Sequence, residues 1–179
     1  MKKHTLLWSS LILTMVMLFT ACDNTEEAEF AAEGLRPVYI DPGDFSNIYS
    51  SSPRPLVETG KIYYYLNYIF IGDAGIGVHV VDNTDPREPV NIAFINIPSN
   101  NDIAIQGNVM YADNGRDLVV LDISDPTDVK ELNRFDDMYS ESIQSYPPFY
   151  NGYFECVDTE KGIVIKWEEA TLTNPKCRR

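Results

Sequence analysis

The sequence of 179 residues is short of histidine, cysteine and basic residues. It has two histidines, His4 and His79, so a histidine-rich metal site is improbable and a Ser-His-Asp triad would have to be built on His79. Lysine and arginine together number 14 against 27 aspartates and glutamates, which gives a formal net charge of −13. Such an acidic chain disfavours nucleic acid as a partner. We expect neither a nucleic acid partner nor a cofactor.

Long helices are also missing from the pattern. Outside residues 1–21 no segment has the 3.6-residue apolar periodicity of a long helix. The longest apolar run, residues 6–19, is shorter than the about 20 residues that cross a membrane. It follows Lys2 and Lys3 and ends in small residues, as an export signal does. We therefore predict a signal peptide over residues 1–21.

The end of this leader carries a candidate lipid anchor. Leu18-Phe19-Thr20-Ala21-Cys22 resembles the lipobox of bacterial lipoproteins, in which the cysteine becomes the lipidated first residue. Phe19 departs from the common aliphatic residue, and an ordinary secretory signal is the alternative. Acyl chains on Cys22 would hold the protein on a membrane through its N-terminus.

Residues 22–35 begin with a polar, acidic stretch that we interpret as a tether. An acidic stretch directly after the lipidated cysteine resembles the signal that sends some Bacteroidetes lipoproteins to the outer face of the outer membrane. Acidic tethers also serve solubility alone, so that face stays open. The expected location is the cell envelope, as an outer-membrane lipoprotein with possible surface exposure.

Two cysteines remain once Cys22 is set aside. Cys156 and Cys177 form an isolated pair, which in an oxidising compartment predicts a disulfide, with two free thiols as the alternative. The closed loop of about 20 residues would stabilise the fold by roughly 3 kcal/mol on the chain-entropy estimate.

The centre of the chain contains an internal repeat. Residues 69–95 and 109–135 align without a gap at an offset of 40. The matched positions are Asp73/Asp113, Gly75/Gly115, Val80/Val120, Asp82/Asp122, Asp85/Asp125 and Pro86/Pro126. A period of about 40 in strand-rich sequence is typical of propeller blades.

Each copy contains four short runs rich in β-branched and aromatic residues, separated by turn residues. The expected strands are 62–65, 68–71, 78–81 and 90–95, then 103–105, 109–112, 118–121 and 132–135. A degraded third copy is expected at 153–158 and 162–167. Residues 30–60 contain four prolines, so we expect loops there, with short strands at most at 38–40 and 56–58.

The runs Gly77–Pro86 and Asp117–Pro126 resemble the LVIVD repeat, a blade-type repeat of bacterial and archaeal envelope proteins. With its leader the chain resembles the LVIVD-containing lipoproteins of Bacteroidetes, whose repeats are taken to form a β-propeller. The resemblance implies an all-β fold of blade-type antiparallel sheets in a domain over 36–179. Its two full blades would cover 60–98 and 99–138, with a partial blade at 150–170. It implies no catalytic residue.

Two blades cannot close a ring of at least four. The domain is therefore an open partial propeller, or it closes by association, or the chain is shorter than its relatives. Open sheet edges are usually covered by something. We expect a protein partner or self-association at these edges.

Four aspartates of the repeat could bind calcium or could shape turns. Asp82, Asp85, Asp122 and Asp125 precede or lie close to Pro86 and Pro126. They lack the dense spacing of a dedicated calcium loop. Aspartate before proline commonly accepts backbone N–H groups, so we interpret them as structural turn positions and expect no metal. His79 aligns with the apolar Val119 and is expected in the core or at an edge.

Acidic and aromatic residues leave two other functions open. Carboxylate pairs such as Glu141 with Glu155, or Glu168 with Glu169, could serve glycoside hydrolysis. Aromatic residues could stack on sugars or simply pack; these are Tyr63, Tyr64, Tyr65, Tyr146, Phe149, Tyr150 and Tyr153. The leading hypothesis is a lipid-anchored, non-enzymatic envelope protein whose repeats present an interaction surface. The alternatives are a surface glycan hydrolase and a calcium-stabilised adhesion module.

Overall fold

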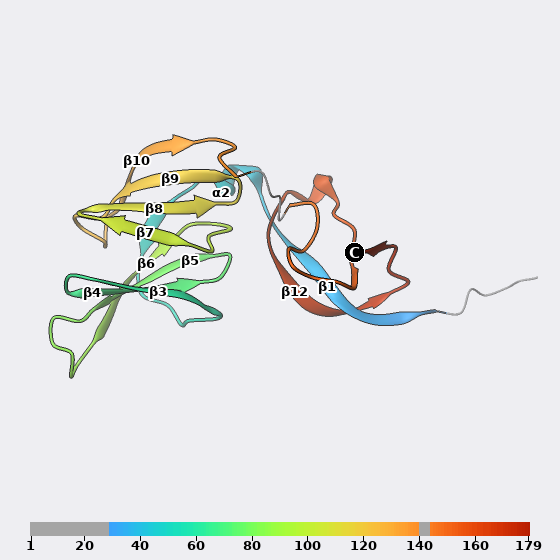
Figure 1. Ribbon diagram of the computed structural model, residues 1–179, viewed down its shortest axis with the longest axis horizontal. Coiled ribbons are helices and arrows are strands. Elements are labelled where there is room, and N and C mark those ends of the chain that lie inside the picture. The colour runs from blue at the N-terminus through green and yellow to red at the C-terminus, as the bar shows by residue number, and fades with distance from the viewer. Residues whose placement is uncertain (1–28, 140–143) are drawn as a thin grey trace, which may run out of the picture.

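The structure is a computed structural model that describes residues 29–139 and 144–179. The described residues form three β-sheets with two short helical turns. Figure 1 shows two of the sheets stacked together and the third beside them, joined by the segment that contains α2. The predicted all-β fold with several separate, largely antiparallel sheets is confirmed.

The first repeat folds as a five-stranded antiparallel sheet, here called blade 1, in the order β2-β6-β5-β4-β3. Its strands are β2 (Tyr49–Ser51), β3 (Thr59–Tyr65), β4 (Tyr68–Asp73), β5 (Gly77–Asp82) and β6 (Val90–Asn96). The four predicted runs are strands β3 to β6. The short β2, which the sequence did not suggest, adds to the edge of β6.

The second repeat forms blade 2, a four-stranded antiparallel sheet in the order β10-β9-β8-β7. Its strands are β7 (Ile103–Gln106), β8 (Val109–Asn114), β9 (Asp117–Asp122) and β10 (Lys130–Phe135). The chain leaves blade 1 from β6 and enters blade 2 at β7, the strand that corresponds to β3 on the opposite edge of blade 1. This step from one edge of a sheet to the opposite edge of the next is the connection that builds a propeller.

The third sheet joins the two ends of the described chain and is called the terminal sheet. Its strands are β1 (Ala31–Ile40), β11 (Tyr153–Phe154), β12 (Ile163–Thr173) and β13 (Cys177–Arg178), in the order β12-β1-β11-β13. The predicted third copy of the repeat is wrong in its pairing, because β11 and β12 do not pair with each other. Both pair with β1, β11 in parallel and β12 antiparallel.

Residues 30–60 also differ from the expectation. The predicted short strand at 38–40 is the end of the ten-residue β1, whose partner β12 supplies a long edge. The predicted strand at 56–58 is absent from the structure, because Val57 and Glu58 give their N–H groups to the Asp73 side chain instead of to a strand. Two helical turns interrupt the strands, α2 (Pro42–Phe45), capped by the Asp41 side chain, and η1 (Thr159–Lys161).

The main hydrophobic core lies between the two blades. Blade 1 contributes side chains from β4, β5 and β6, and blade 2 contributes side chains from β7, β8 and β9. The core residues are Phe70, Val78, Val80, Ala93, Ile95, Ile97, Ile103, Ile105, Met110, Ala112, Val119, Leu121, Ile123 and Val129. Burial of this apolar area, at roughly 25 cal/mol per Å², is the main stabilising term that holds one blade on the other.

A difference in one turn shifts the two repeats relative to each other. In blade 1 a three-residue loop joins β4 to β5, and Asp73 pairs with Gly77. In blade 2 the loop has two residues, and Asn114 pairs with Asp117. The strands before this loop therefore correspond at an offset of 41, although the strands after it correspond at 40. The gapless alignment is wrong for β3 and β4, and a shift of one residue turns side chains to the opposite face.

Candidate interaction surfaces

Each blade has one face in the core and one face turned away from the other blade. Side chains alternate between the faces of a strand, so the core residues identify the inner face and their neighbours the outer face. The outer face of blade 1 includes Ile62, Tyr64, Ile69, Ile71, His79, Val81 and Phe94. The outer face of blade 2 is represented by Tyr111, Leu118, Val120 and Phe135.

The outer face of blade 1 is apolar and open near β3. Ile62 is 60% exposed and Tyr64 is 64% exposed, although both lie in a paired strand. Towards β6 the same face is covered, because the Arg54 guanidinium lies 3.6 Å from the Phe94 ring centroid and Phe94 is fully buried. The exposed apolar area therefore lies over β3 and β4.

The outer face of blade 2 is also apolar. Tyr111 is 37% exposed on β8 and Phe135 is 46% exposed on β10. Between them, Val120 on the central strand β9 pairs with Tyr111. Exposed apolar side chains that lie side by side on a sheet mark an interaction surface more often than scattered ones do.

The predicted core histidine forms a buried pair with an aspartate of the repeat. The Nε2 atom of His79 lies 3.1 Å from Oδ2 of Asp73, and the His79 ring packs edge-on against Phe94 at 4.9 Å. Both side chains are almost fully buried, so neither can reach a substrate in solution. Burial alone would raise the pKa of Asp73, but hydrogen bonds from the Glu58 N–H, His79 and the Val57 N–H outweigh it and lower that pKa.

Asp73 and Asp113 both hold the segment that enters their own blade. Asp73 accepts the N–H groups of Val57 and Glu58, just before β3. Asp113 Oδ1 accepts the N–H groups of Asn101 and Asp102, just before β7, at 2.8 Å each. Burial raises the pKa of Asp113, and these hydrogen bonds offset part of that effect.

The structure places Asn114, one residue after Asp113, in a buried polar network at the same end of blade 2. Its Nδ2 donates to the carbonyl of Pro98 at 2.6 Å and to that of Phe45 at 3.3 Å. Its Oδ1 accepts from Arg134, which also pairs with Asp117 and forms two hydrogen bonds with Glu131. The network ties α2 and the entry segment to blade 2.

The four aspartates near the prolines accept hydrogen bonds from their own turns. Asp82 accepts the N–H and hydroxyl of Thr84, and Asp122 accepts those of Ser124. Asp125 likewise accepts both groups of Thr127, whereas Asp85 accepts the Arg87 N–H. Hydrogen bonds from the hydroxyl and the N–H lower the pKa of Asp82, Asp122 and Asp125.

The two prolines complete these turns at different places. Pro86 lies in an exposed turn of blade 1. The carbonyl of Pro126 accepts a hydrogen bond from the Ser50 hydroxyl, which in turn accepts the Val129 N–H. Ser50 belongs to β2, so the turn that contains Pro126 also links blade 2 to the edge strand of blade 1.

Cys156 and Cys177 form the predicted disulfide, with their Cα atoms 5.3 Å apart. The bond links Cys156, two residues after the end of β11, to the first residue of β13, so it closes the edge of the terminal sheet. Cys22, the predicted lipid attachment residue, lies outside the described residues, as does Glu141.

The carboxylates considered for glycoside hydrolysis and the aromatic residues considered for sugar stacking do not come together in one site among the described residues. Glu155 is paired with Arg36 at 3.0 Å, and Glu168 and Glu169 are neighbours on β12, where side chains alternate between faces. Of the three tyrosines on β3, Tyr64 lies on the outer face, and Tyr63 and Tyr65 pack against the core.

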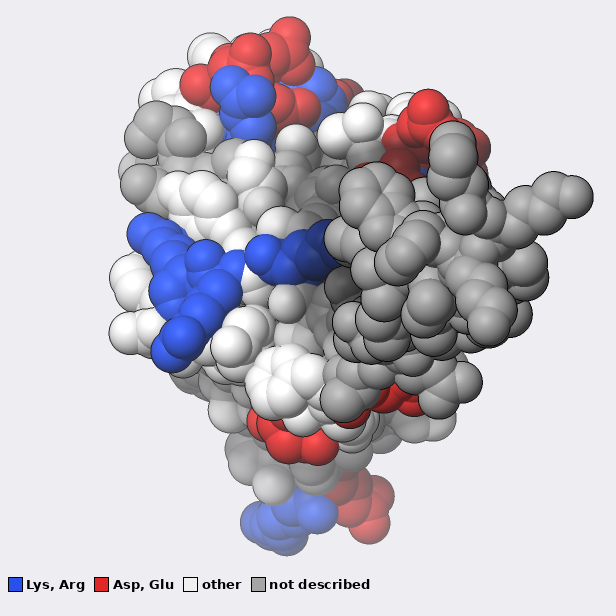
Figure 2. All heavy atoms as spheres, turned by 90° about the vertical axis from the view of Figure 1, so that its right-hand side faces the viewer, with Lys and Arg blue, Asp and Glu red and all other residues white. Residues whose placement is uncertain are grey.

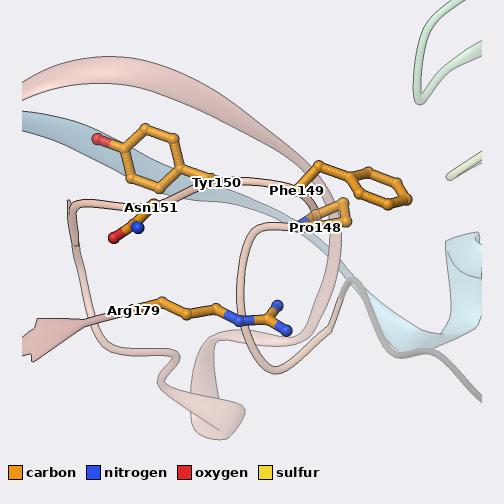
Figure 3. Close-up of a pocket in the computed structure, with 5 residues that line it drawn as sticks. All are labelled: Pro148, Phe149, Tyr150, Asn151 and Arg179. Atoms are coloured by element: carbon orange, nitrogen blue, oxygen red, sulfur yellow. The ribbon is translucent and has the colours of Figure 1, made fainter.

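Two of the later aromatic residues, Phe149 and Tyr150, line an open pocket of about 570 Å³ beside the terminal sheet. Figure 3 shows its lining residues, with Phe149 pointing away from Tyr150 and Arg179 reaching below them. The guanidinium of Arg179 lies 4.2 Å from the Tyr146 ring, and that of Arg178 lies 5.1 Å from the Tyr153 ring. An arginine guanidinium therefore already covers one face of two of the seven aromatic rings that could stack on sugars, Tyr146 and Tyr153.

Charge is unevenly placed on the end of the molecule that carries the terminal sheet. Figure 2 shows Lys and Arg side chains side by side across the middle of this end, with Asp and Glu groups above and below. In this otherwise acidic chain, that band is the most basic part of the face in view. Screening by salt limits its effect on partners to about 8 to 10 Å from the surface.

Within residues 29–139 and 144–179, no three potential metal-ligating side chains come together as a group. Over the same residues, no helix has the length and apolar character that crossing a membrane requires.

Comparison with protein families supports the repeat. Residues 99–137 match the family model of the LVIVD repeat. The LVIVD repeat thus coincides with blade 2 together with the segment that enters it. No curated protein and no solved structure matches the chain.

Sequence reasoning missed the structural roles of Asp73, Asn114 and Arg134. The repeat alignment already placed Asp73 and Asp113 in register, and an aspartate at the end of a strand before a glycine turn signals a polar anchor. The nearby Glu131 is the local partner of Arg134, but nothing local could have identified its role in the network, because Asn114 and Asp117 come from two other strands.

Proposed function

We propose that the protein is a lipid-anchored, non-enzymatic component of the cell envelope whose blades form a surface for binding other protein chains. The observation that supports this function is the pair of apolar outer faces, with Tyr64 and Ile62 exposed on one blade and Tyr111 and Phe135 on the other. Burial of such area against a partner is favourable by roughly 25 cal/mol per Å².

A binding role also agrees with the position of the single histidine of the mature chain. His79 is buried and engaged with Asp73, which removes it from contact with a substrate. The carboxylate Glu155 is paired with Arg36 and lies near Lys161. Neither group is poised for general acid or base catalysis.

Photo-cross-linking tests the binding role. A photoreactive amino acid at Tyr64 or Tyr111 is expected to form protein adducts in intact cells, and one at Phe149 is expected to form fewer. Phe149 is a matched control because it is fully exposed and aromatic but lies on neither outer face. Equal adduct formation at all three positions would contradict a specific surface.

The lipid anchor has its own test. Wild-type protein is expected to incorporate labelled palmitate and to sediment with membranes, and Cys22→Ser is expected to lose the label and to appear in the soluble fraction. Protease treatment of intact cells then reports whether the domain lies on the cell surface. Membrane sedimentation of unlabelled Cys22→Ser would count against lipid anchoring.

A further inference from the structure

The contact between blade 1 and blade 2 shows how two blades of this chain fit together. Tyr63, on the inner face of blade 1, donates its hydroxyl to the carbonyl of Ile105 on β7 at 3.3 Å. Around this contact the inner faces are apolar and nearly fully buried, as at Phe70 and Met110. The same contact serves as a template for how a blade of this chain could pack on a blade of another chain.

The strand pairing shows which residues of the two blades are equivalent. Tyr68 pairs with Asp82 in blade 1, and Val109 pairs with Asp122 in blade 2, so β3 and β4 correspond to β7 and β8 at an offset of 41. The strands β5 and β6 correspond to β9 and β10 at an offset of 40. Structural equivalence is therefore defined by pairing and differs from the sequence alignment.

By this equivalence the outer face of blade 1 repeats the inner face of blade 2. The inner-face residues Ile103, Ile105, Met110, Ala112, Val119 and Leu121 correspond, in that order, to the outer-face residues Ile62, Tyr64, Ile69, Ile71, His79 and Val81. Five of the six outer residues are apolar or aromatic, as the buried set is. The outer face of blade 1 thus has the composition of a surface that packs on another blade.

The outer face of blade 2 repeats the inner face of blade 1 in the same way. Tyr111, Leu118, Val120 and Phe135 correspond to the buried Phe70, Val78, Val80 and Ile95. These four positions remain apolar, whereas the fifth, Asn133, is a polar residue at the place of the buried Ala93. The two outer faces therefore have the same complementary patterns as the two inner faces that already pack together.

We infer that the outer face of blade 2 in one copy of this chain packs on the outer face of blade 1 in a second copy. This inference rests on the proposed binding function and names the partner. Because the two faces differ, the contact is head-to-tail, and such contacts close into rings when the rotation allows it. Propellers have typically four to eight blades, so about two to four copies of a two-blade chain would close one.

The terminal sheet leaves room for this contact. It packs against the loops at one end of the blades, where Gly75 lies against Lys166 of β12. In Figure 1 it lies beyond the ends of the blade strands, and the open parts of both outer faces are not covered by it.

Cysteine cross-linking between two variants tests the inference directly. Within the chain Tyr63 contacts Ile105, and their structural equivalents on the outer faces are Ala104 and Tyr64. Full-length chains that carry Ala104→Cys and Tyr64→Cys, purified in mild detergent, are mixed and treated with a thiol-specific bifunctional cross-linker whose spacer is about as long as a tyrosine side chain. The mixture is expected to form a covalent dimer, and each variant alone is expected to form much less.

The controls separate a head-to-tail contact from other associations. The parent chain reports any cross-linking through Cys22, and Phe149→Cys reports random collision at an exposed site. Dimers that form equally well in either single variant would indicate a face-to-face contact and overturn the inference. Absence of mixed dimers above the Phe149→Cys level would also overturn it.

Light scattering of the same full-length chain gives an independent measurement. The wild type is expected to have a mass of two or more copies, and Tyr111→Lys is expected to weaken association about tenfold or more, with unchanged circular dichroism. A monomeric wild type would exclude the second copy as the occupant. If photo-cross-links at Tyr64 and Tyr111 then lead to a different protein, the proposed binding function survives and this inference fails.

Discussion

At the scale of single residues, aspartate has distinct structural roles in this repeat. Asp82, Asp122 and Asp125 lie at the surface and order their own turns through a neighbouring hydroxyl and N–H. Asp73 is fully buried and holds the segment that precedes β3. The adjacent prolines made the turn aspartates conspicuous in the sequence. Substitution of the buried Asp73 or its partner His79 is expected to cost more stability, because it leaves buried polar groups without a hydrogen-bond partner.

Asp73→Asn is predicted to lower the free energy of unfolding by about 1–3 kcal/mol at pH 7. The carboxylate now accepts hydrogen bonds from two backbone N–H groups, and the amide NH₂ of asparagine would face one of these donors instead of accepting from it. The folded-state pKa of Asp73 is lowered. Its stabilising contribution is therefore complete above the ordinary carboxyl pKa and is lost as pH falls through the folded-state pKa.

Urea unfolding from pH 7 to pH 2.5 measures this effect. The difference between wild type and Asp73→Asn is expected to shrink as the pH falls. Asp128→Asn is the control, because Asp128 is an exposed partner of Lys130 and its loss is expected to change stability by less than about 1 kcal/mol. Equal losses in the two variants would contradict the role of the buried carboxylate.

At the scale of elements, the sequence pattern predicted those strands that pair with a neighbour in the sequence. Eight of the nine strands of the blades were predicted, because each of these eight pairs with a neighbour in the sequence. The ninth, β2, was missed, since it pairs with β6 more than 40 residues away in the sequence. The ten-residue β1 was largely missed, since its sequence contains Gly34 and Pro37 and its partners lie at the other end of the chain. Pairing over such a distance leaves no local signal.

The orientation of the strands was harder to predict than their existence. Phe70 and Met110 align in the repeat and both lie in the core between the blades, yet they are not structurally equivalent. By strand pairing the equivalent of Phe70 is Tyr111, which lies on the outer face of blade 2. One additional residue in the loop after β4 causes this difference. Because β4 and β8 are apolar on both faces, the sequence pattern is compatible with either orientation.

Gly34→Ala is predicted to destabilise the terminal sheet by about 1–3 kcal/mol, because its Cβ would lie 2.3 Å from the Tyr153 carbonyl oxygen and 2.7 Å from Leu172. Thermal unfolding measures the change. Gly60→Ala is the matched strand control, since its Cβ would have no contact closer than 3.4 Å and should cause a much smaller shift. If Gly60→Ala had the larger effect, close packing at β1 would be excluded as the cause.

The disulfide offers a second test of the terminal sheet. Cys156→Ser/Cys177→Ser removes a link that spans 21 residues and is expected to lower stability by roughly 3 kcal/mol on the chain-entropy estimate. Hydrogen exchange should locate the increased opening in β11 and β13 more than in β8 and β9. Uniform loss of protection would show that the terminal sheet and the blades unfold as one unit.

At the scale of the whole molecule, the two blades and the terminal sheet make an open array in which part of each outer face is exposed. The turns of the repeat are ordered by hydrogen bonds from protein groups to aspartate side chains, as at Asp82 and Asp122. The resemblance to a propeller repeat led to the prediction of two full blades. It could not reveal which strands would join the two ends of the chain.

Removal of divalent metal is predicted to leave the melting temperature unchanged within about 1 °C, because the turn aspartates already accept hydrogen bonds from Thr84, Ser124 and Thr127. Differential scanning calorimetry with excess chelator and with millimolar calcium measures this. A calcium-dependent rise in melting temperature would revive the adhesion module as the better description.

The pairing of β1 with β11 and β12 has a consequence for biosynthesis. A chain emerges from the ribosome with its N-terminal end first, so β1 is made early but its partner strands are made last. The two blades can collapse on each other as soon as residue 135 is available, since their pairing is local. During that interval β1 has unpaired backbone groups on both of its edges. Until β11 and β12 arrive, β1 is therefore a strand of this fold that is open to premature pairing with another chain.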